Sequence, residues 1–265
     1  MSSSDNAIVT YEVQGQIALI TLNRPDARNA INGDVAAGLE AAIDKLEAEA
    51  GVWCGVLTAN TEGHKTPVFC AGADLKAINS GQAAALNTQR GGFAGFVYRE
   101  RSKPVIAAVD GLATAGGCEI VLACDVVVAS DRSQFGLAEV KRNLIAGAGG
   151  LFRLPRAIGR NVAMEAILTG DPLSAERAYQ LGLVNHLVAP ELTLTKALEV
   201  AGKIASSAPI AVAKSRKIVL ASAYENDDTL KAMTDEAFGD VLRSEDTKEG
   251  LEAFIEKRQP NWKGR

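Results

Sequence analysis

Two acidic side chains stand in stretches of the sequence that are otherwise apolar or small. Glu119 follows two glycines and precedes the run Ile120-Val121-Leu122-Ala123, and Glu139 comes soon after Phe135. Burial penalises the charged form of a carboxyl group, so a buried pair of carboxyls can share a proton near neutral pH. Such a pair is suited to general acid–base catalysis, and Glu119 and Glu139 are our candidate catalytic residues.

Each acid also has a purely structural explanation, and the residue pattern alone leaves both open. Glu119 would lie in the first turn of a helix, where a carboxylate on the surface can compensate the helix dipole. The apolar residues after it leave little polar face for that role. Glu139 is followed by Lys141 and Arg142, which could pair with it at the surface.

Three turns in the chain are unusually rich in glycine and alanine. They read "FCAGADL", "GLATAGGCE" and "LIAGAGGLF", and each lies where a strand pattern gives way to a helix pattern. Free backbone N–H groups at a helix start attract negative charge, and small residues let a ligand approach them closely. Two such N–H groups from different turns could form an oxyanion hole. Tight packing of small residues is the competing explanation for any single turn.

The elements that must position these residues follow an α/β order. An alternating pattern around Gln14 and Gly15 predicts a hairpin, residues 32–51 predict a helix capped by Asn32, and residues 52–59 predict a buried strand. A strand at 103–111, a Gly-rich turn, a helix at 117–125 and a strand at 126–130 repeat this order. No period of fixed length recurs, so a solenoid is not supported.

Helix patterns dominate the last third of the chain. We expect helices near 192–206, 210–224, 227–243 and 246–257, with apolar faces that either cover the core or meet another subunit. The prediction is therefore an α/β core over residues 1–200 and a helical C-terminal region over residues 201–265.

Composition and charge exclude several classes of function. The 265 residues are 47% hydrophobic and 23% charged, with a net charge of −4, which is ordinary for a globular protein and gives no broad basic surface for nucleic acid. The four cysteines form no C-x-x-C pair, and His64 and His186 stand alone. We expect no metal site, no nucleic-acid partner and reduced cysteines.

No membrane or targeting segment is expected. Residues 1–6 are polar and lack a basic region followed by an apolar stretch, and Asp110 and Asp125 interrupt the longest apolar runs. The sequence therefore predicts a cytoplasmic protein that does not enter a membrane.

Taken in order along nearly the whole chain, these motifs resemble the crotonase superfamily of enoyl-CoA hydratases and isomerases. The matching segments are "LNRPDARNAIN", "FCAGADLKAI", "GLATAGGCEIVLACD", "QFGLAEV", "GAGGLFRLPRAIG", "LTGDPLSAERAYQLGLVNHLV" and "EGLEAFIEKRQPNWKGR". The resemblance implies a spiral of repeated ββα units with a helical C-terminal oligomerisation region. It also implies assembly as a homotrimer or as a dimer of trimers.

The resemblance also implies a role for each matching position. Glu119 and Glu139 would be the acid/base pair around one water, Ala73 and Gly116 would bind the thioester oxygen through their N–H groups, and Gly147 would position the water. The residues implied near coenzyme A are Ala27, Arg28, Asp74, Leu75, Lys76, Phe254 and Lys257, the last two reaching a neighbouring subunit's ligand. Arg28, Lys76 and Lys257 would be partners for phosphate, and solvated surface cations are the alternative for each.

Two positions depart from the family pattern. Ala146 stands where a proline often precedes the Gly-Ala-Gly-Gly turn, and Ala115 replaces the first of three glycines before Cys118. Neither change removes a catalytic group, but both leave the shape of the acyl pocket open. Residues 77–100 would wall that pocket in the family, and a mobile surface helix is the alternative for this segment.

The expected reaction is addition of water to a trans-2-enoyl-CoA, giving a 3-hydroxyacyl-CoA, with no cofactor besides the coenzyme A of the substrate. Two fixed donors would stabilise the enolate oxygen, each worth roughly 3–4 kcal/mol. Glu139 would be the principal acid/base and Glu119 would position the water. The alternatives are a Δ3,Δ2-enoyl-CoA isomerase, which needs only one base, and a non-catalytic acyl-CoA binding protein. Thioester hydrolysis is a less favoured use of the same oxyanion hole.

Overall fold

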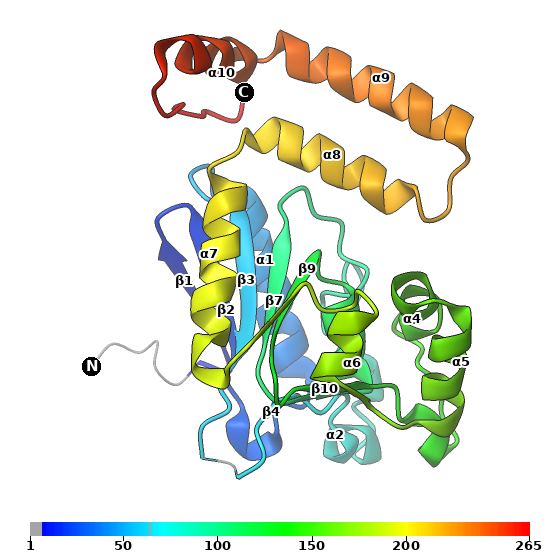
Figure 1. The fold of residues 1–265 in the computed structure, drawn as a ribbon. Helices are drawn as coiled ribbons and strands as arrows, with labels where there is room; N and C mark the ends of the chain where they lie inside the picture. The colour runs from blue at the N-terminus through cyan, green and yellow to red at the C-terminus, as the bar shows by residue number, and fades with distance from the viewer. Residues whose placement is uncertain (1–6, 64) are drawn as a thin grey trace.

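The computed structural model describes residues 7–63 and 65–265 of the chain. Residues 1–6, for which we expected no targeting segment, and His64 lie outside the described residues. Two sheets and the helices that connect and cover them form the body of the molecule, and the last three helices extend from one end of it (Figure 1).

The larger sheet has six strands in the order β1-β2-β3-β7-β9-β12. β1 and β2 form the hairpin expected from the alternating pattern, with Gln14 paired to Ile17, and the remaining neighbours run parallel. Parallel strands buried on both faces are rich in small and branched apolar residues, as seen here. The strands are β1 (Val9–Gln14), β2 (Ile17–Leu22), β3 (Cys54–Ala59), β7 (Val105–Val109), β9 (Val126–Ser130) and β12 (His186–Val188).

Helices cover both faces of this sheet (Figure 1). α1 (Gly33–Ala48) is capped by Asn32, whose side chain accepts a hydrogen bond from the Val35 N–H, and buries Leu39, Ile43 and Leu46 in the main core. α7 (Thr193–Ala205) packs Ala197 and Ala201 against the opposite face. The boundary that we expected at residue 200 lies within α7, and the division into two parts stays a prediction.

The smaller sheet has four strands in the order β11-β10-β8-β4. Its strands are β4 (Val68–Cys70), β8 (Leu112–Thr114), β10 (Gln134–Gly136) and β11 (Leu173–Ser174). β3, β7 and β9 of the large sheet are each followed by a strand of the small sheet and then by helical structure. This alternation is the ββα spiral that the family resemblance implied.

The helices that follow the small-sheet strands position the candidate site. They are α2 (Leu75–Asn79), α3 (Gly116–Leu122), α4 (Gly150–Ile158), α5 (Arg160–Thr169) and α6 (Ala175–Gln180). Short 3₁₀ helices are η1 (Pro25–Ala27), η2 (Ala83–Leu86), η3 (Glu139–Arg142) and η4 (Pro190–Leu192), and a two-stranded ribbon pairs β5 (Asn87–Thr88) with β6 (Gly92–Phe93).

Three further helices form the C-terminal region. They are α8 (Pro209–Ala221), α9 (Asp227–Arg243) and α10 (Glu245–Glu256), close to the ranges that the sequence predicted. Arg216 of α8 donates to the Asp125 carboxylate at 2.9 Å and to the backbone oxygen of Arg101 at 2.5 Å. These contacts join the C-terminal helices to the core.

Candidate active site

The turn that contains Ala73 is held by the loop at residues 24–31. The Ile31 N–H donates to the Gly72 carbonyl at 2.8 Å, and the Asp74 N–H donates to the Ile31 carbonyl at 2.8 Å. Ile31 and Ala73 thus form an isolated parallel bridge. Because successive amides of extended backbone point to opposite sides, the Ala73 N–H faces away from Ile31.

The turn that contains Gly116 lies directly beside it. A Cβ added to Gly72 would lie 2.9 Å from the Gly116 nitrogen, so only glycine fits where the two turns meet. A Cβ added to Gly116 would in turn overlap the ring of Phe93. Gly116 is the first residue of α3, where N–H groups have no partner within the helix.

Ala115 gives this turn an unusual backbone. Its φ of 51° and ψ of −128° lie in a region that favours glycine, and its own N–H donates to the Gly136 carbonyl at 2.8 Å. The conformation fixes how the next peptide, which carries the Gly116 N–H, is directed. Among the described residues, neither the Gly116 nor the Ala73 N–H donates to another backbone group. Both therefore remain free to bind an oxygen atom of a ligand.

Glu119 is buried in the first turns of α3. Glu119 is 3% exposed, and its Oε1 accepts a hydrogen bond from the Gly150 N–H at 2.8 Å. Burial raises the pKa of this carboxyl to about 7, and the charge of Glu139 adds to the rise. The amides of Gly150 and Ala148 and the charge of Arg153 act in the opposite direction. A buried carboxyl with such a pKa can take up or release a proton near neutral pH.

Glu139 begins η3 and is less buried than Glu119. Burial raises its pKa, whereas its own backbone N–H and the charge of Arg142 lower it. Its Oε2 is buried and has no hydrogen-bond partner among the described residues. Lys141, which the sequence offered as a surface partner, pairs instead with Asp171 at 2.6 Å. The surface ion pair is therefore not formed with Lys141, and Glu139 keeps an oxygen free to accept a proton.

The third Gly/Ala turn, at residues 146–150, lies against Glu119 of α3 and against the Leu137 side chain. Gly150 and Gly149 lead into α4, and the Gly150 amide is the one bound to Glu119. Gly147 is exposed at the tip, and a Cβ added there would meet only the Ile145 carbonyl at 3.9 Å. Ala146, at the position where the family often has proline, is 4% exposed and lies against Gly150.

The residues implied near coenzyme A form two groups in the structure. Ala27, Arg28, Asp74, Leu75 and Lys76 lie on the two turns that Ile31 joins. Arg28, Leu75 and Lys76 are exposed there. Asp74 is already engaged, because its carboxylate caps α2 by accepting from the Lys76 N–H at 3.0 Å and pairs with Arg24 at 3.2 Å. Arg24 and that capping interaction hold the pKa of Asp74 below its usual value.

Phe254 and Lys257 lie far from this group within one chain. They stand at the end of α10, at the opposite end of the molecule from α2 (Figure 1). Phe254 is 84% exposed, and Lys257 ends the helix with a φ of 55°. Contact between these residues and coenzyme A would need a neighbouring subunit, as the sequence interpretation stated.

Three side chains that the sequence interpretation did not single out as functional support the site. Asn29 is 1% exposed, and its amide donates to the carbonyls of Asn60 at 2.8 Å and Val68 at 3.0 Å. Arg153 donates to the carbonyls of Ala148 at 3.1 Å and Val97 at 2.5 Å. The Tyr98 hydroxyl donates to the Gly147 carbonyl at 3.1 Å. Apart from Ala148, which is five residues from Arg153, their partners are backbone atoms distant in sequence, which no local pattern indicates.

Residues 77–100 do not form the surface helix that was one alternative for them. Beyond the end of α2 they form η2, the β5–β6 ribbon and turns, and Phe93 and Phe96 are buried. The glycines at 91, 92 and 95 explain the difference, because the last two have φ of 64° and 65°, which a helix does not allow.

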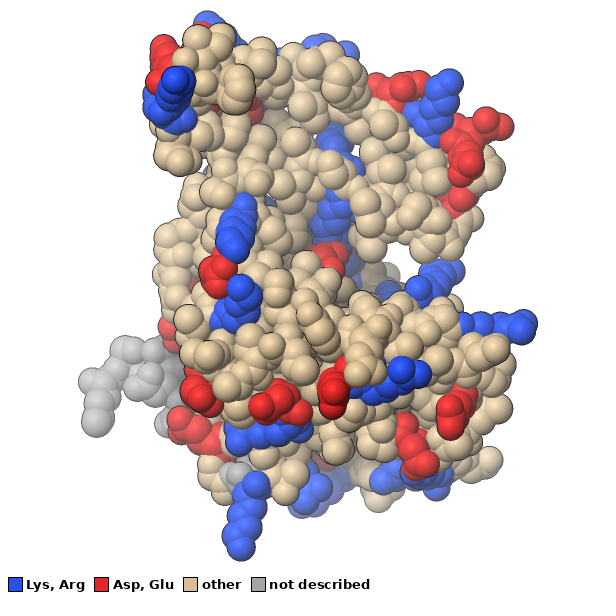
Figure 2. All heavy atoms as spheres, viewed as in Figure 1, with Lys and Arg blue, Asp and Glu red and all other residues tan. Residues whose placement is uncertain are grey.

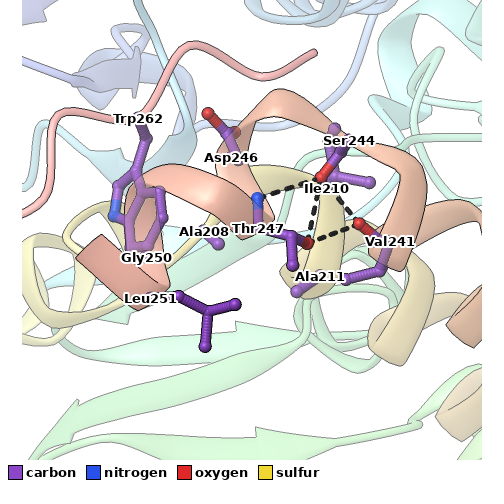
Figure 3. Close-up of a pocket in the computed structure, with 10 residues that line it drawn as sticks. All are labelled: Ala208, Ile210, Ala211, Val241, Ser244, Asp246, Thr247, Gly250, Leu251 and Trp262. Atoms are coloured by element: carbon purple, nitrogen blue, oxygen red, sulfur yellow. Dashed lines mark hydrogen bonds between the residues drawn. The ribbon is translucent and has the colours of Figure 1, made fainter. Parts of the chain in front are cut away.

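A separate hollow lies among the C-terminal helices (Figure 3). This cavity of about 240 Å³ is lined mainly by apolar groups, including Val241, Leu251 and Trp262. Its carboxylate, Asp246, accepts hydrogen bonds from the backbone N–H groups of Lys263 at 2.7 Å and Gly264 at 2.8 Å. That carboxylate is used to hold the C-terminal tail, so the cavity has no free acid for proton transfer.

The described residues give no sign of a nucleic-acid surface, a metal site or a membrane span. On the face drawn in Figure 2, acidic and basic side chains are interspersed. Within residues 7–63 and 65–265, no group of three or more His, Cys, Asp or Glu side chains is placed to hold a metal ion. No helix of this part of the chain has both the length and the apolarity needed to span a bilayer.

Comparison with known proteins shows which family and which solved structures the chain resembles. Residues 12–265 match the family model described as enoyl-CoA hydratase/isomerase. The chain is 38% identical over 258 residues to a short-chain-enoyl-CoA hydratase of Clostridium acetobutylicum, covering 95% of each protein. It is 36% identical over 253 residues to a 2,3-dehydroadipyl-CoA hydratase of Escherichia coli, covering 95% of this chain and 97% of the relative. The crystal structure of an enoyl-CoA hydratase from Mycobacterium tuberculosis superimposes with a TM-score of 0.92 at 44% identity, covering 98% of this chain and 100% of the other.

Proposed function

Because the chain belongs to the enoyl-CoA hydratase/isomerase family, we propose that it adds water to the double bond of a trans-2-enoyl-CoA and yields a 3-hydroxyacyl-CoA. One observation carries the proposal most directly. Two carboxyls, Glu119 and Glu139, both have raised pKa values and lie near enough that the charge of one raises the pKa of the other. Hydration needs a water held and deprotonated at one carbon and a proton supplied to the next, which suits such a pair.

The Ala73 and Gly116 N–H groups would form the oxyanion hole. As hydroxide adds to the β carbon, negative charge develops on the thioester oxygen as an enolate. Two fixed amide donors stabilise that charge without reorganising, and each is worth roughly 3–4 kcal/mol of the activation barrier. The clamp from Ile31 to Gly72 and Asp74, and the backbone of Ala115, support this assignment because they direct the two amides.

Glu139 would take the proton from water, and Glu119 would position the same water. The free, buried Oε2 of Glu139 supports its role as the base. Glu119 has one oxygen bound to the Gly150 amide, and its pKa of about 7 supports a shared or delivered proton. The Gly147 N–H, at the tip of the adjacent turn, would hold the water from the other side.

Two features support hydration over the alternatives. An isomerase moves a proton between two carbons and needs one base, whereas this site keeps two carboxyls. A binding protein would gain nothing from burying Glu119, because the burial that raises its pKa costs folding free energy at neutral pH. We assign no particular acyl group to the substrate, since the relatives named above are named for acyl chains as different as short-chain enoyl and 2,3-dehydroadipyl groups.

The substrate would bring its coenzyme A, and no further cofactor is proposed. Arg28 and Lys76 are exposed beside the oxyanion turn and would meet phosphate there. Phe254 and Lys257 would meet the coenzyme A of a neighbouring subunit in a trimer or a dimer of trimers. Exposed Leu251, Phe254 and Ile255, which are 63%, 84% and 77% exposed on α10, support burial of this helix in an assembly.

The experiment distinguishes hydration, isomerisation and binding without reaction, using the wild-type chain. Crotonyl-CoA and longer trans-2-enoyl-CoAs are mixed with the protein, and the loss of the conjugated thioester absorbance is followed with product analysis. A 3-enoyl-CoA is tested in parallel for a gain of the same absorbance. Hydration predicts loss with a 3-hydroxyacyl-CoA product. Tight binding with no loss at any chain length would favour the binding protein, and gain from the 3-enoyl-CoA alone would favour the isomerase.

A further inference from the structure

Tyr98 stands beside the candidate site with no role assigned to it by the proposed reaction. Its ring is partly exposed, with the residue 48% exposed, and its hydroxyl donates to the Gly147 carbonyl at 3.1 Å. The ring is seated against Gly92, where an added Cβ would lie 2.4 Å from the Tyr98 Cδ2. A backbone bond from the Tyr98 N–H to the Gly91 carbonyl at 2.9 Å fixes the residue further.

The acceptor of this hydrogen bond belongs to a peptide group that also faces Glu119. The Gly147 carbonyl and the Ala148 N–H are the two ends of one planar trans peptide, and they point in opposite directions. The Ala148 amide lowers the pKa of the Glu119 carboxyl, and the Gly150 amide of the same turn donates to that carboxylate at 2.8 Å. Holding the carbonyl end of this peptide therefore sets the direction of its amide end.

We propose that Tyr98 is a positioning residue that acts on Glu119 through the single peptide between Gly147 and Ala148. The hydroxyl fixes the carbonyl oxygen, and the amide of the same peptide is thereby aimed at the carboxylate. This inference rests on the proposed function, because it gives Tyr98 a part in the hydration that Glu119 supports. It also links the 77–100 segment, which carries Tyr98, to the proton-transfer groups.

Arg153 strengthens this connection from a neighbouring element. Its guanidinium lies 5.3 Å from the centre of the Tyr98 ring, and it donates to the Ala148 and Val97 carbonyls on either side of the contact. Tyr98 and Arg153 thus connect the carbonyls of Gly147 and Ala148 to the 91–98 segment. The turn has no regular secondary structure of its own before α4, so these contacts set its geometry.

The groups that face Glu119 define what a pH measurement would report. Glu139 of η3 raises its pKa, Arg153 of α4 lowers it, and the thiol of Cys118 on α3 lies close to both carboxyls. Burial raises the pKa of Cys70 on β4 to about 12, so that thiol stays neutral near pH 7. Loss of the Ala148 donor would raise the pKa of Glu119, because that donor favours the charged form.

The test is Tyr98→Phe, which removes only the hydroxyl. We expect kcat for crotonyl-CoA to fall about tenfold with KM changed less than twofold, since the substrate-binding amides are untouched. The limb of the pH–rate profile that belongs to Glu119 should move toward higher pH. The matched control is Tyr11→Phe, which removes a hydroxyl bonded to Glu49 at 2.9 Å on the far hairpin and should leave kcat and the profile unchanged.

A double variant separates a local effect from a general one. If Tyr98 acts through Glu119, Tyr98→Phe should cause little further loss in a Glu119→Gln background, because the two changes remove one linked function. An equal loss in both backgrounds, or a wild-type kcat and pH profile in Tyr98→Phe, would overturn the inference. Absence of hydration by the wild type would contradict the proposed function instead. In that case the pH dependence of thermal stability still tests the link, because the shift of the Glu119 titration by Tyr98→Phe needs no turnover.

Discussion

Glu119 is the residue where function and stability conflict most plainly. It is almost fully buried, and one backbone amide at 2.8 Å is its closest compensation. A carboxyl whose pKa rises to about 7 on folding binds protons more tightly in the native state than in the unfolded chain between about pH 4.5 and 7. The group therefore supports folding at acidic pH, and that support is lost as the pH rises through 7.

Replacing this carboxyl should stabilise the protein in a pH-dependent way. We expect Glu119→Gln to be more stable than the wild type at pH 8, with a free energy of unfolding larger by up to about 3 kcal/mol. Its Tm at pH 8 should be correspondingly higher. The difference should disappear well below pH 4.5, where the carboxyl is protonated in both the native and the unfolded wild type. Thermal melts across this range measure it. A difference that is constant with pH would show that titration of Glu119 is not its cause.

At the scale of elements, the site depends on how three turns are held. Ile31 clamps the Ala73 turn, Ala115 shapes the start of α3, and Asn29 fixes the loop that carries Ile31. The sequence indicated the three Gly/Ala turns, because Gly and Ala spacing is local information. Two of them lie at strand-to-helix junctions as expected, whereas the third lies between η3 and α4. The sequence did not indicate Asn29 or Tyr98, because their partners are backbone atoms of strands and turns far along the chain.

Ala115 carries a conformational strain that glycine would relieve. Its φ of 51° and ψ of −128° disfavour a residue with a Cβ. Ala115→Gly should stabilise the chain by about 1 kcal/mol, with kcat within twofold of the wild type, because the direction of the Gly116 amide is kept. Ala113→Gly, in the adjacent strand β8, is the control and should destabilise. A lower Tm for Ala115→Gly would show that the turn holds no strain.

Asn29 should matter more for stability than a helix cap of the same residue type. Its side chain is buried and bonds three backbone groups, namely the Arg24 N–H and the carbonyls of Asn60 and Val68. Asn29→Ala leaves these groups buried without partners and should cost about 2–4 kcal/mol. Asn32→Ala removes one capping bond of α1 and should cost about 1 kcal/mol. Denaturant unfolding measures the loss of stability in both variants. Equal losses would show that Asn29 contributes no more to stability than the helix cap.

At the scale of the whole molecule, the α/β spiral and the helical C-terminal third were predictable. The contacts by which the C-terminal helices join the core were not. The alternation of strand and helix patterns indicated α/β layering, and the family resemblance implied the ββα order. The helix α5 and the ribbon of β5 and β6 were not anticipated, because their apolar residues follow short or glycine-interrupted patterns. How α8 joins the core, through Arg216 and Asp125, depends on a pair 91 residues apart in the chain.

The exposed apolar face of α10 gives a prediction about assembly. Phe254→Glu should shift the protein from the proposed trimer or dimer of trimers toward monomer, because a charge on an 84% exposed side chain costs little in the monomer but much in an apolar interface. Light scattering after size-exclusion chromatography measures the mass. Glu252→Gln, on the exposed polar side of the same helix, is the control. An unchanged mass in Phe254→Glu would remove α10 from the interface.

The most direct test of the central claim is the rate of crotonyl-CoA hydration by Glu119→Gln and Glu139→Gln beside the wild type. Each variant keeps the size of its side chain and should still bind acyl-CoA. We predict that each loses at least about 100-fold in kcat, because proton transfer is removed while the oxyanion amides remain. Glu165→Gln, an exposed glutamate of α5, should match the wild type. A near-normal rate in either Glu119→Gln or Glu139→Gln would contradict the paired-carboxyl mechanism.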